Sequence, residues 1–78
     1  MSSQIEEKVI ALLETLVDNS VLPINLDDHL VDDLDLDSLH VIDITLMCED
    51  DFGIEILDED MDNTHTVSDI IQIVKDRI

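Results

Sequence analysis

The chain has 78 residues, of which 45% are hydrophobic and only Phe52 is aromatic. This length suits a single domain over residues 1–78 with an aliphatic core, and so high a hydrophobic share excludes a disordered acidic tail. Three lysines and arginines against 21 aspartates and glutamates give a formal net charge of −18, which excludes sequence-independent binding to nucleic acid and argues against docking on anionic membranes.

Other function classes are excluded by what the sequence lacks. No apolar run approaches the ~20 residues of a membrane span, and residues 1–7 hold no basic stretch before an apolar one, so we expect no signal peptide. Cys48 is the only cysteine, which favours a reducing, cytoplasmic setting. The histidines have no metal-ligand spacing, so we expect no metal site, and we expect a monomer.

The acidic residues are concentrated in the middle of the chain. Residues 27–62 hold 15 of the 21 acids, and no lysine or arginine lies between Val9 and Val74. Solubility alone would tolerate interspersed bases. We therefore favour a docking face that steers basic partners, over a purely solubilising surface.

The first predicted helix runs from about Gln4 to Val17. Ser3 and Glu6 have the spacing of a capping box, and Asp18 to Ser20 followed by Pro23 end the helix. Its buried face is predicted to be Ile5, Val9, Leu12, Leu13 and Leu16. A long loop follows to about Asp37, and its apolar residues should tuck under it and keep it ordered: Leu22, Ile24, Leu26, Leu30, Val31 and Leu34.

Three further helical segments complete the expected fold. A second helix runs from about Ser38 to Asp51 or Phe52, and Gly53 suits the left-handed residue after its end. Residues 58–63 could form a short helical turn. A capping box from Thr66 to Asp69 starts a last amphipathic helix with Val67, Ile70, Ile71, Val74 and Ile78. The fold class is all-α: a small four-helix bundle with three main helices, one short helix and a long ordered first loop.

The second helix carries two apolar stripes. At about 100° per residue, one stripe spans about 80° and belongs in the core; it comprises Val41, Ile44, Cys48 and Phe52. The other is centred roughly 150° away and is flanked by acids; it comprises Leu39, Ile42 and Leu46 with Asp43, Glu49 and Asp50. A helix in a small bundle normally needs only one buried face. The second apolar stripe therefore indicates a surface that binds a partner, unless the long loop covers it.

Ser38 opens the second helix, where orphan N–H groups and the positive end of the helix dipole lie. On the residues alone, an ordinary capping role for Ser38 or Asp37 outweighs a covalent phosphodiester on Ser38. Catalysis by the chain itself is not expected, and no catalytic residue is proposed. A nucleophile elbow needs glycines where Leu36 and His40 stand.

A calcium loop is the alternative left open for the acidic segment. Asp58, Asp60 and Asp62 stand at offsets 1, 3 and 5 of an EF-hand pattern, with Asn63 at 6 and Asp69 at 12. An aspartate is a poor substitute for the bidentate glutamate at the last position, and Asp69 is better used to start a helix. The alternative function is thus an acidic calcium-binding or protein-interaction module without a prosthetic group.

The whole chain resembles the acyl carrier proteins. The resemblance rests on a serine motif at the start of the second helix and on the acidic end of that helix, followed by two shorter matches: residues 33–39 (DLDLDSL), 41–44 (VIDI), 49–56 (EDDFGIEI), 58–60 (DED) and 64–67 (THTV). Three positions depart from the family pattern. Asp35 stands where the family usually has Gly, His40 where it usually has an acid, and Leu57 where it often has Pro.

The resemblance implies a carrier whose partner enzymes do the chemistry. Ser38 would accept 4'-phosphopantetheine from coenzyme A through a phosphopantetheinyl transferase that uses Mg²⁺, and the arm's thiol would hold an acyl thioester. Acyl-loading and acyl-processing enzymes with basic docking faces would meet the surface formed by Asp37, Leu39, Ile42, Asp43, Leu46, Glu49 and Asp50. The acyl chain would slip between helices lined by Val41, Ile44, Cys48, Ile56 and Met61. The departures leave general fatty acid synthesis and a specialised pathway (polyketide, lipid A or aminoacyl) equally open.

Overall fold

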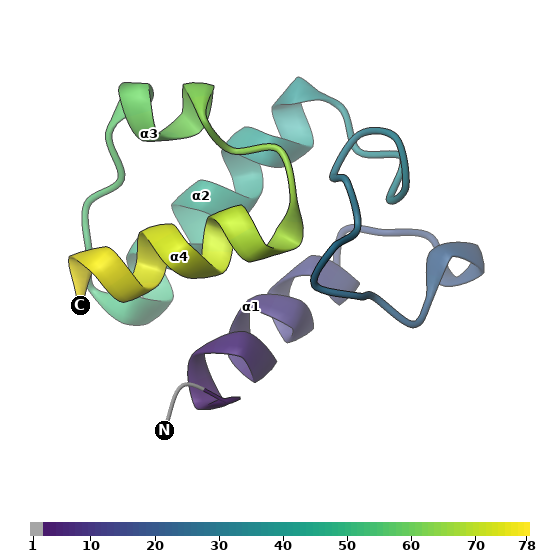
Figure 1. Cartoon of the computed structure of the whole chain (residues 1–78), viewed down its shortest axis with the longest axis horizontal. Coiled ribbons are helices and arrows are strands. Elements are labelled where there is room, and N and C mark those ends of the chain that lie inside the picture. The colour runs from purple at the N-terminus through teal and green to yellow at the C-terminus, as the bar shows by residue number, and fades with distance from the viewer. Residues whose placement is uncertain (1–2) are drawn as a thin grey trace.

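The computed structural model describes residues 3–78, apart from the side chain of Ser3, and over this range every regular element is helical. The elements are α1 (Ser3–Glu14), a 3₁₀ turn η1 (Asn19–Val21), α2 (Ser38–Phe52), α3 (Asp58–Asp62) and α4 (Val67–Arg77). Helices α1, α2 and α4 pack on one another, and the short α3 bridges α2 and α4 (Figure 1). The expected all-α bundle is confirmed. The capping box predicted at Ser3 depends on a side chain outside the described residues.

Helix α1 ends at Glu14, three residues before the predicted Val17. The Thr15 hydroxyl donates to the Leu12 carbonyl at 2.6 Å, and the Thr15 N–H donates to the same oxygen at 3.2 Å. The chain therefore tightens to i→i+3 bonding, which the Leu16 N–H continues to the Leu13 carbonyl. A threonine side chain that competes for a backbone carbonyl explains the early end of the helix.

The other helix ends follow the local sequence. Gly53 adopts a left-handed φ of 65° at the end of α2, and its N–H donates to the Glu49 carbonyl. At the start of α4 the Thr66 hydroxyl accepts the Asp69 N–H at 3.3 Å, and an Asp69 carboxylate oxygen accepts the Thr66 N–H at 3.0 Å. Both of these predictions are confirmed. None of the helices described over residues 3–78 is long and apolar enough to cross a bilayer.

The core is aliphatic and takes residues from the helices and from the long loop. Its buried hydrophobic members are Val9, Leu13, Ile24, Leu30, Leu34, Leu36, Ile44, Cys48, Val67, Ile70, Ile71 and Val74. The long loop is anchored by the residues that it contributes to this core, as expected for an ordered segment: Ile24, Leu30, Leu34 and Leu36. The expectation is wrong for Leu22, Leu26 and Val31, which are exposed on the loop surface.

Asp35 lies in the left-handed region with φ of 57°, between two buried leucines. An L side chain costs about 1–2 kcal/mol there, although Asp tolerates the conformation better than most residues, whereas Gly adopts it freely. We expect Asp35→Gly to have a free energy of unfolding about 1 kcal/mol above that of Asp35→Ala, in urea unfolding of both variants. Both substitutions remove the same charge, so equal stabilities would mean that the loop backbone relaxes at this position.

Candidate functional site

Ser38 is the first residue of α2 and is exposed. The capping role belongs to Asp37, whose carboxylate accepts the His40 N–H at 3.0 Å, while His40 Nδ1 accepts the Asp37 N–H at 3.3 Å. The N–H donated by the His40 backbone holds the pKa of the Asp37 carboxyl below its usual value, with a smaller contribution from the His40 ring. The structure thus resolves the two capping candidates in favour of Asp37, and the Ser38 hydroxyl is left at the solvent-facing start of the helix.

The start of α2 suits an anionic group on Ser38. The first turn of a helix offers backbone N–H groups without intrahelical acceptors, and its dipole favours negative charge by about 0.3–1 kcal/mol. Asp37 uses only part of this capacity through its bond to the His40 N–H. A phosphodiester on the neighbouring serine therefore fits the residues present.

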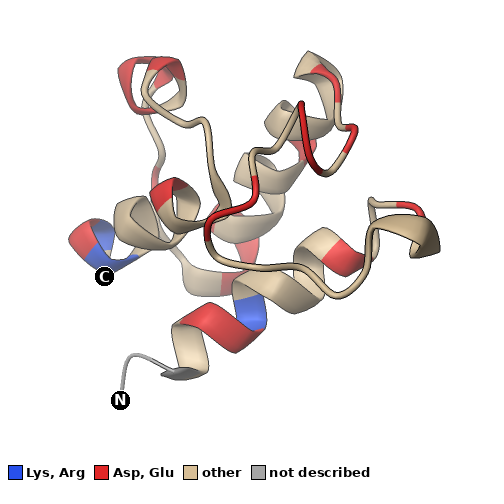
Figure 2. Cartoon of the chain, turned by 45° about the vertical axis from the view of Figure 1, so that its right-hand side comes forward, with Lys and Arg blue, Asp and Glu red and all other residues tan. Residues whose placement is uncertain are grey.

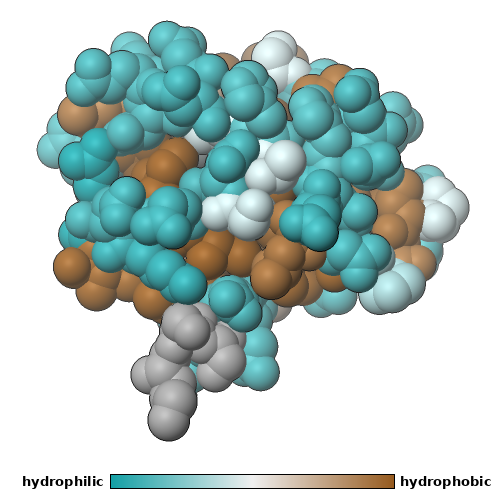
Figure 3. All heavy atoms as spheres, viewed as in Figure 1, coloured by the Kyte–Doolittle hydropathy of each residue, from teal (hydrophilic) through white to brown (hydrophobic). Residues whose placement is uncertain are grey.

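The outward face of α2 is apolar and uncovered. Leu39, Ile42 and Leu46 are 69%, 42% and 56% exposed, so the alternative that the long loop buries them is wrong. Asp43 and Asp50 are exposed near them on the same helix. Figure 2 shows acidic positions on α1, α2, α3 and α4 and along the long loop, whereas the basic positions lie on α1 and at the end of α4. On the face shown in Figure 3, hydrophilic residues surround smaller hydrophobic areas.

Glu49 has a structural role in addition to its predicted place on this face. It is half-buried, and its Oε2 accepts the Ile56 N–H at 2.8 Å. This bond fastens the segment between α2 and α3 to the side of α2. Glu49 is therefore less available to a partner than the exposed Asp43 and Asp50.

The residues expected to line the acyl chain lie on α2, on the α2–α3 connection and on α3. Ile44 and Cys48 are fully buried, and Val41, Ile56 and Met61 are half-buried. Thr45, which the analysis of apolar residues missed, is buried at the same place: its hydroxyl donates to the Ile42 carbonyl at 2.7 Å and lies 4.0 Å from Met61 Sδ. Its spacing of four residues from Val41 and three from Cys48 is the helical signal that would have found it.

Cys48 is a buried thiol with little nucleophilic character. Burial raises its pKa to about 11, and the charge of Asp51 contributes in the same direction. It is protonated at neutral pH and behaves as a small hydrophobic residue in the core, as the sequence predicts.

The sequence matches known carrier families along nearly all of its length. The family model "Phosphopantetheine attachment site" matches residues 7–74. An acyl carrier protein of Rickettsia canadensis (strain McKiel) is 33% identical over 76 residues, covering 97% of this chain and 88% of the relative. That of Rhodococcus erythropolis is 35% identical over 74 residues, covering 90% of this chain and 81% of the relative.

The chain belongs to the acyl carrier protein family. A crystal structure of an acyl carrier protein from Thermotoga maritima shares the fold, with a TM-score of 0.81, 24% identity, and coverage of 97% of this chain and 88% of that one. The resemblance stated from the sequence is thereby confirmed. Acyl carrier proteins are carriers rather than catalysts, and as a family they interact with phosphopantetheinyl transferases and acyl-processing enzymes. Membership of this family assigns covalently attached 4'-phosphopantetheine to the chain.

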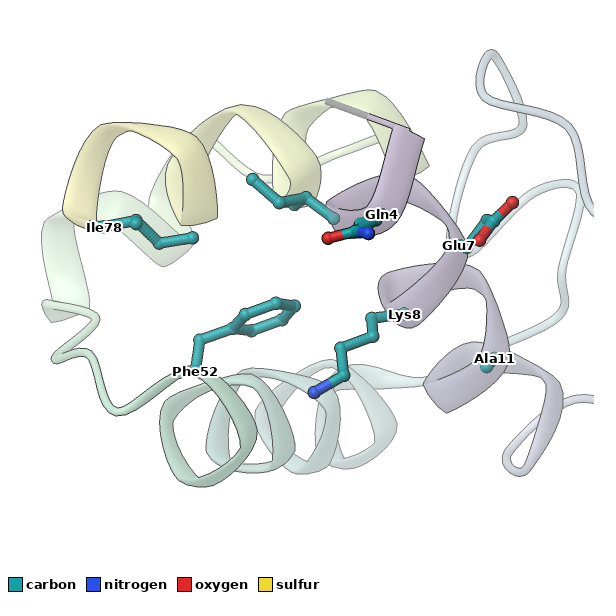
Figure 4. A pocket seen from close by; sticks show the side chains of 7 residues that line it. Gln4, Glu7, Lys8, Ala11, Phe52 and Ile78 are labelled. Atoms are coloured by element: carbon teal, nitrogen blue, oxygen red, sulfur yellow. The ribbon is translucent and has the colours of Figure 1, made fainter. Parts of the chain in front are cut away.

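The carrier has a hollow at the end of α2 farthest from Ser38, and the sequence pattern gives no sign of it. The hollow of about 480 Å³ lies between α1, the end of α2 and the C-terminus, lined by Gln4, Ile5, Glu7, Lys8, Ala11, Phe52 and Ile78 (Figure 4). Lys8 Nζ lies 5.5 Å from the Phe52 ring centroid and 3.9 Å from Asp51. At a rise of 1.5 Å per residue this end lies about 20 Å along the helix from Ser38, so the hollow is separate from the serine site.

The acids of the calcium loop that was left open as an alternative lie in helices and their caps in this carrier. Asp58, Asp60 and Asp62 fall in α3, and Asp60 accepts the Leu57 N–H at 3.1 Å and pairs with Arg77. The carboxylate of Asp69 accepts the backbone N–H groups of His65 and Thr66. Across residues 3–78, no three or more His, Cys, Asp or Glu side chains are arranged to hold a metal ion.

Proposed function

We propose that Ser38 carries the 4'-phosphopantetheine group as a phosphodiester, and that the arm's thiol holds the acyl cargo as a thioester. The observation that carries this proposal is the division of roles at the start of α2. Asp37 caps the helix, and the adjacent Ser38 is exposed at the position where helix N–H groups favour a phosphate. The transferase forms the bond between the Ser38 oxygen and phosphorus, and adenosine 3',5'-bisphosphate leaves.

The partner surface is the exposed face of α2, and we name it the docking face. Its apolar centre comprises Leu39, Ile42 and Leu46, and its acidic rim comprises Asp37, Asp43, Glu49 and Asp50. An apolar centre with a charged rim is the usual anatomy of a protein interface, and the acids give it complementarity to enzymes with basic docking faces. The acyl chain is sheltered between α2 and α3 by Val41, Ile44, Cys48, Ile56 and Met61.

The cargo pathway is fatty acid synthesis or a specialised biosynthesis of polyketide, lipid A or aminoacyl type. Of the departures from the family pattern, Asp35 adopts the left-handed conformation that Gly would favour, so it gives no reason for a different cargo. His40 removes an acid beside Ser38, which alters what a partner enzyme meets. We propose that the domain over residues 1–78 acts as a monomer in the cytoplasm, where its single cysteine stays reduced.

The test is loading of the purified chain by a promiscuous phosphopantetheinyl transferase with coenzyme A and Mg²⁺. Intact mass should increase by one phosphopantetheinyl group in the wild type and in Ser20→Ala, a control at another exposed serine, and should not change in Ser38→Ala. A thiol reagent should label the arm of the native loaded protein and leave the buried Cys48 unlabelled. Loading that persists in Ser38→Ala, or a wild type that several transferases leave unmodified, would overturn the assignment.

A further inference from the structure

His29 and His65 lie face to face where the long loop meets the segment before α4. Their ring centroids are 6.3 Å apart and the rings are inclined by 21°. The surrounding backbone is paired: the Leu30 N–H donates to the His65 carbonyl at 2.9 Å, and His29 and Thr66 form an isolated bridge. Two residues more than thirty positions apart in the sequence therefore fasten the loop at one point.

The His29 ring also holds the turn that follows it. His29 Nδ1 accepts the backbone N–H groups of Val31 and Asp32, each at 3.2 Å. A ring nitrogen that accepts hydrogen bonds carries no proton, so the neutral ring has its hydrogen on Nε2. The turn is closed further by the Asp33 carboxylate, which accepts the His29 N–H at 2.7 Å.

We propose that His29 and His65 form a pH-sensitive clasp, which fastens the long loop when both rings are neutral and releases it when they take up protons. A proton on His29 Nδ1 removes the acceptor used by two backbone N–H groups. Two imidazolium rings stacked at this spacing also repel each other. Histidine is the side chain that ordinarily changes charge between about pH 5 and 8, so this is the range in which the proposal is tested.

Carboxylates around the clasp can pair with a protonated histidine ring in place of the hydrogen bonds that the neutral ring accepts. On the loop side these are Asp28, Asp32 and Asp33, and on the α4 side Asp69, which accepts the His65 N–H. An Asp32 carboxylate oxygen lies 3.9 Å from His29 Nδ1. On protonation the ring pairs with this exposed carboxylate, and the Val31 and Asp32 N–H groups lose their acceptor, which opens the turn.

The clasp is coupled to the segment that leads to α2. The Leu36 N–H donates to the carbonyl of Leu30, the same residue whose own N–H is bonded to His65. Release at His65 therefore loosens a chain of bonds that ends just before Asp37. The inference does not depend on the proposed modification of Ser38, because the clasp forms in the unmodified chain.

Amide hydrogen exchange on the unmodified full chain tests this inference. Between pH 7.5 and 5.5, the protection factors of the Leu30, Val31 and Asp32 amides should fall roughly tenfold, corrected for intrinsic exchange, while those of core amides such as Ile44 and Val74 hold. In His29→Asn the side-chain oxygen accepts a backbone N–H in the same way without titrating, so the protection should lose its pH dependence.

Two further variants separate the clasp from general effects of charge. His65→Phe keeps a stacked ring and removes one of the two positive charges, so its pH-dependent loss of protection should be smaller than in the wild type. His40→Gln alters a histidine outside the clasp and should lose protection as the wild type does. Protection at Leu30 that is constant with pH in the wild type, or an equal loss in His29→Asn, would overturn the proposal.

Discussion

Replacing Ile44 with alanine is expected to lower the free energy of unfolding by about 2–5 kcal/mol. Ile44 has no exposed surface and lies in the middle of α2, where the helix meets the rest of the core. A chain of this length has a total stability of about 4–12 kcal/mol, so the loss is a large share of the whole. Urea unfolding followed by circular dichroism, at fixed salt because the chain is so acidic, measures it.

Ile42→Ala is the matched control for Ile44→Ala. The two isoleucines are two residues apart on one helix, but Ile42 is 42% exposed on the outward face. Its truncation removes less buried surface than at Ile44 and leaves no enclosed cavity, and alanine is the better helix former, so the expected cost is only about 1 kcal/mol. Equal costs at the two positions would contradict the assignment of an inward and an outward face to α2.

The helices could be predicted because their signals are local. Gly53 and Thr66 end and begin helices through backbone and side-chain bonds within a few residues, and the apolar periodicity of α2 separates its inward face from its outward one. Both stripes of α2 were predicted in this way. The end of α1 was misplaced because apolar periodicity continued to Leu16, while the Thr15 hydroxyl had already tightened the turn.

The long loop could not be predicted in detail, because its conformation depends on contacts far along the chain. The Ser68 N–H donates to the Leu26 carbonyl, and the Leu30 N–H donates to the His65 carbonyl. These backbone hydrogen bonds select which apolar loop residues enter the core. Composition alone cannot distinguish Leu30, which is buried, from Val31, which is exposed. The same non-local contacts bring His29 and His65 together, although the sequence shows them only as separate histidines.

The place of the candidate site in the fold could be predicted from the sequence, but its contacts could not. The start of α2 at Ser38 and the outward face of this helix follow from the motif and the helical period. The hydrogen bond that the Glu49 carboxylate accepts from the Ile56 N–H does not follow from the sequence. It joins α2 to a segment seven residues later in the chain, and the sequence does not determine the path of that segment. Position 49 was therefore assigned to the partner surface, whereas its carboxylate also holds the fold.

Leu46→Ala is expected to reduce kcat/KM for loading by a phosphopantetheinyl transferase about tenfold to a hundredfold. Leu46 is 56% exposed at the centre of the docking face, so a partner that covers it gains the transfer free energy of a leucine side chain. Because Leu46 is exposed in the free protein, Leu46→Ala should lower the free energy of unfolding only slightly. The matched control is Leu22→Ala, an exposed leucine on the long loop outside this face, which should load at the wild-type rate.

Salt separates the apolar part of docking from the electrostatic part. Asp43→Asn should slow loading a few-fold at low salt and hardly at all at high salt, because a rim charge acts mainly on the rate of encounter and is screened. The defect of Leu46→Ala should persist at both salt concentrations, since burial of apolar surface does not depend on screening. Steady-state kinetics of these variants at two ionic strengths decide the matter. If Leu46→Ala and Leu22→Ala loaded equally well, the transferase would have to bind elsewhere on the chain, and the uncovered stripe of α2 would serve later partners only.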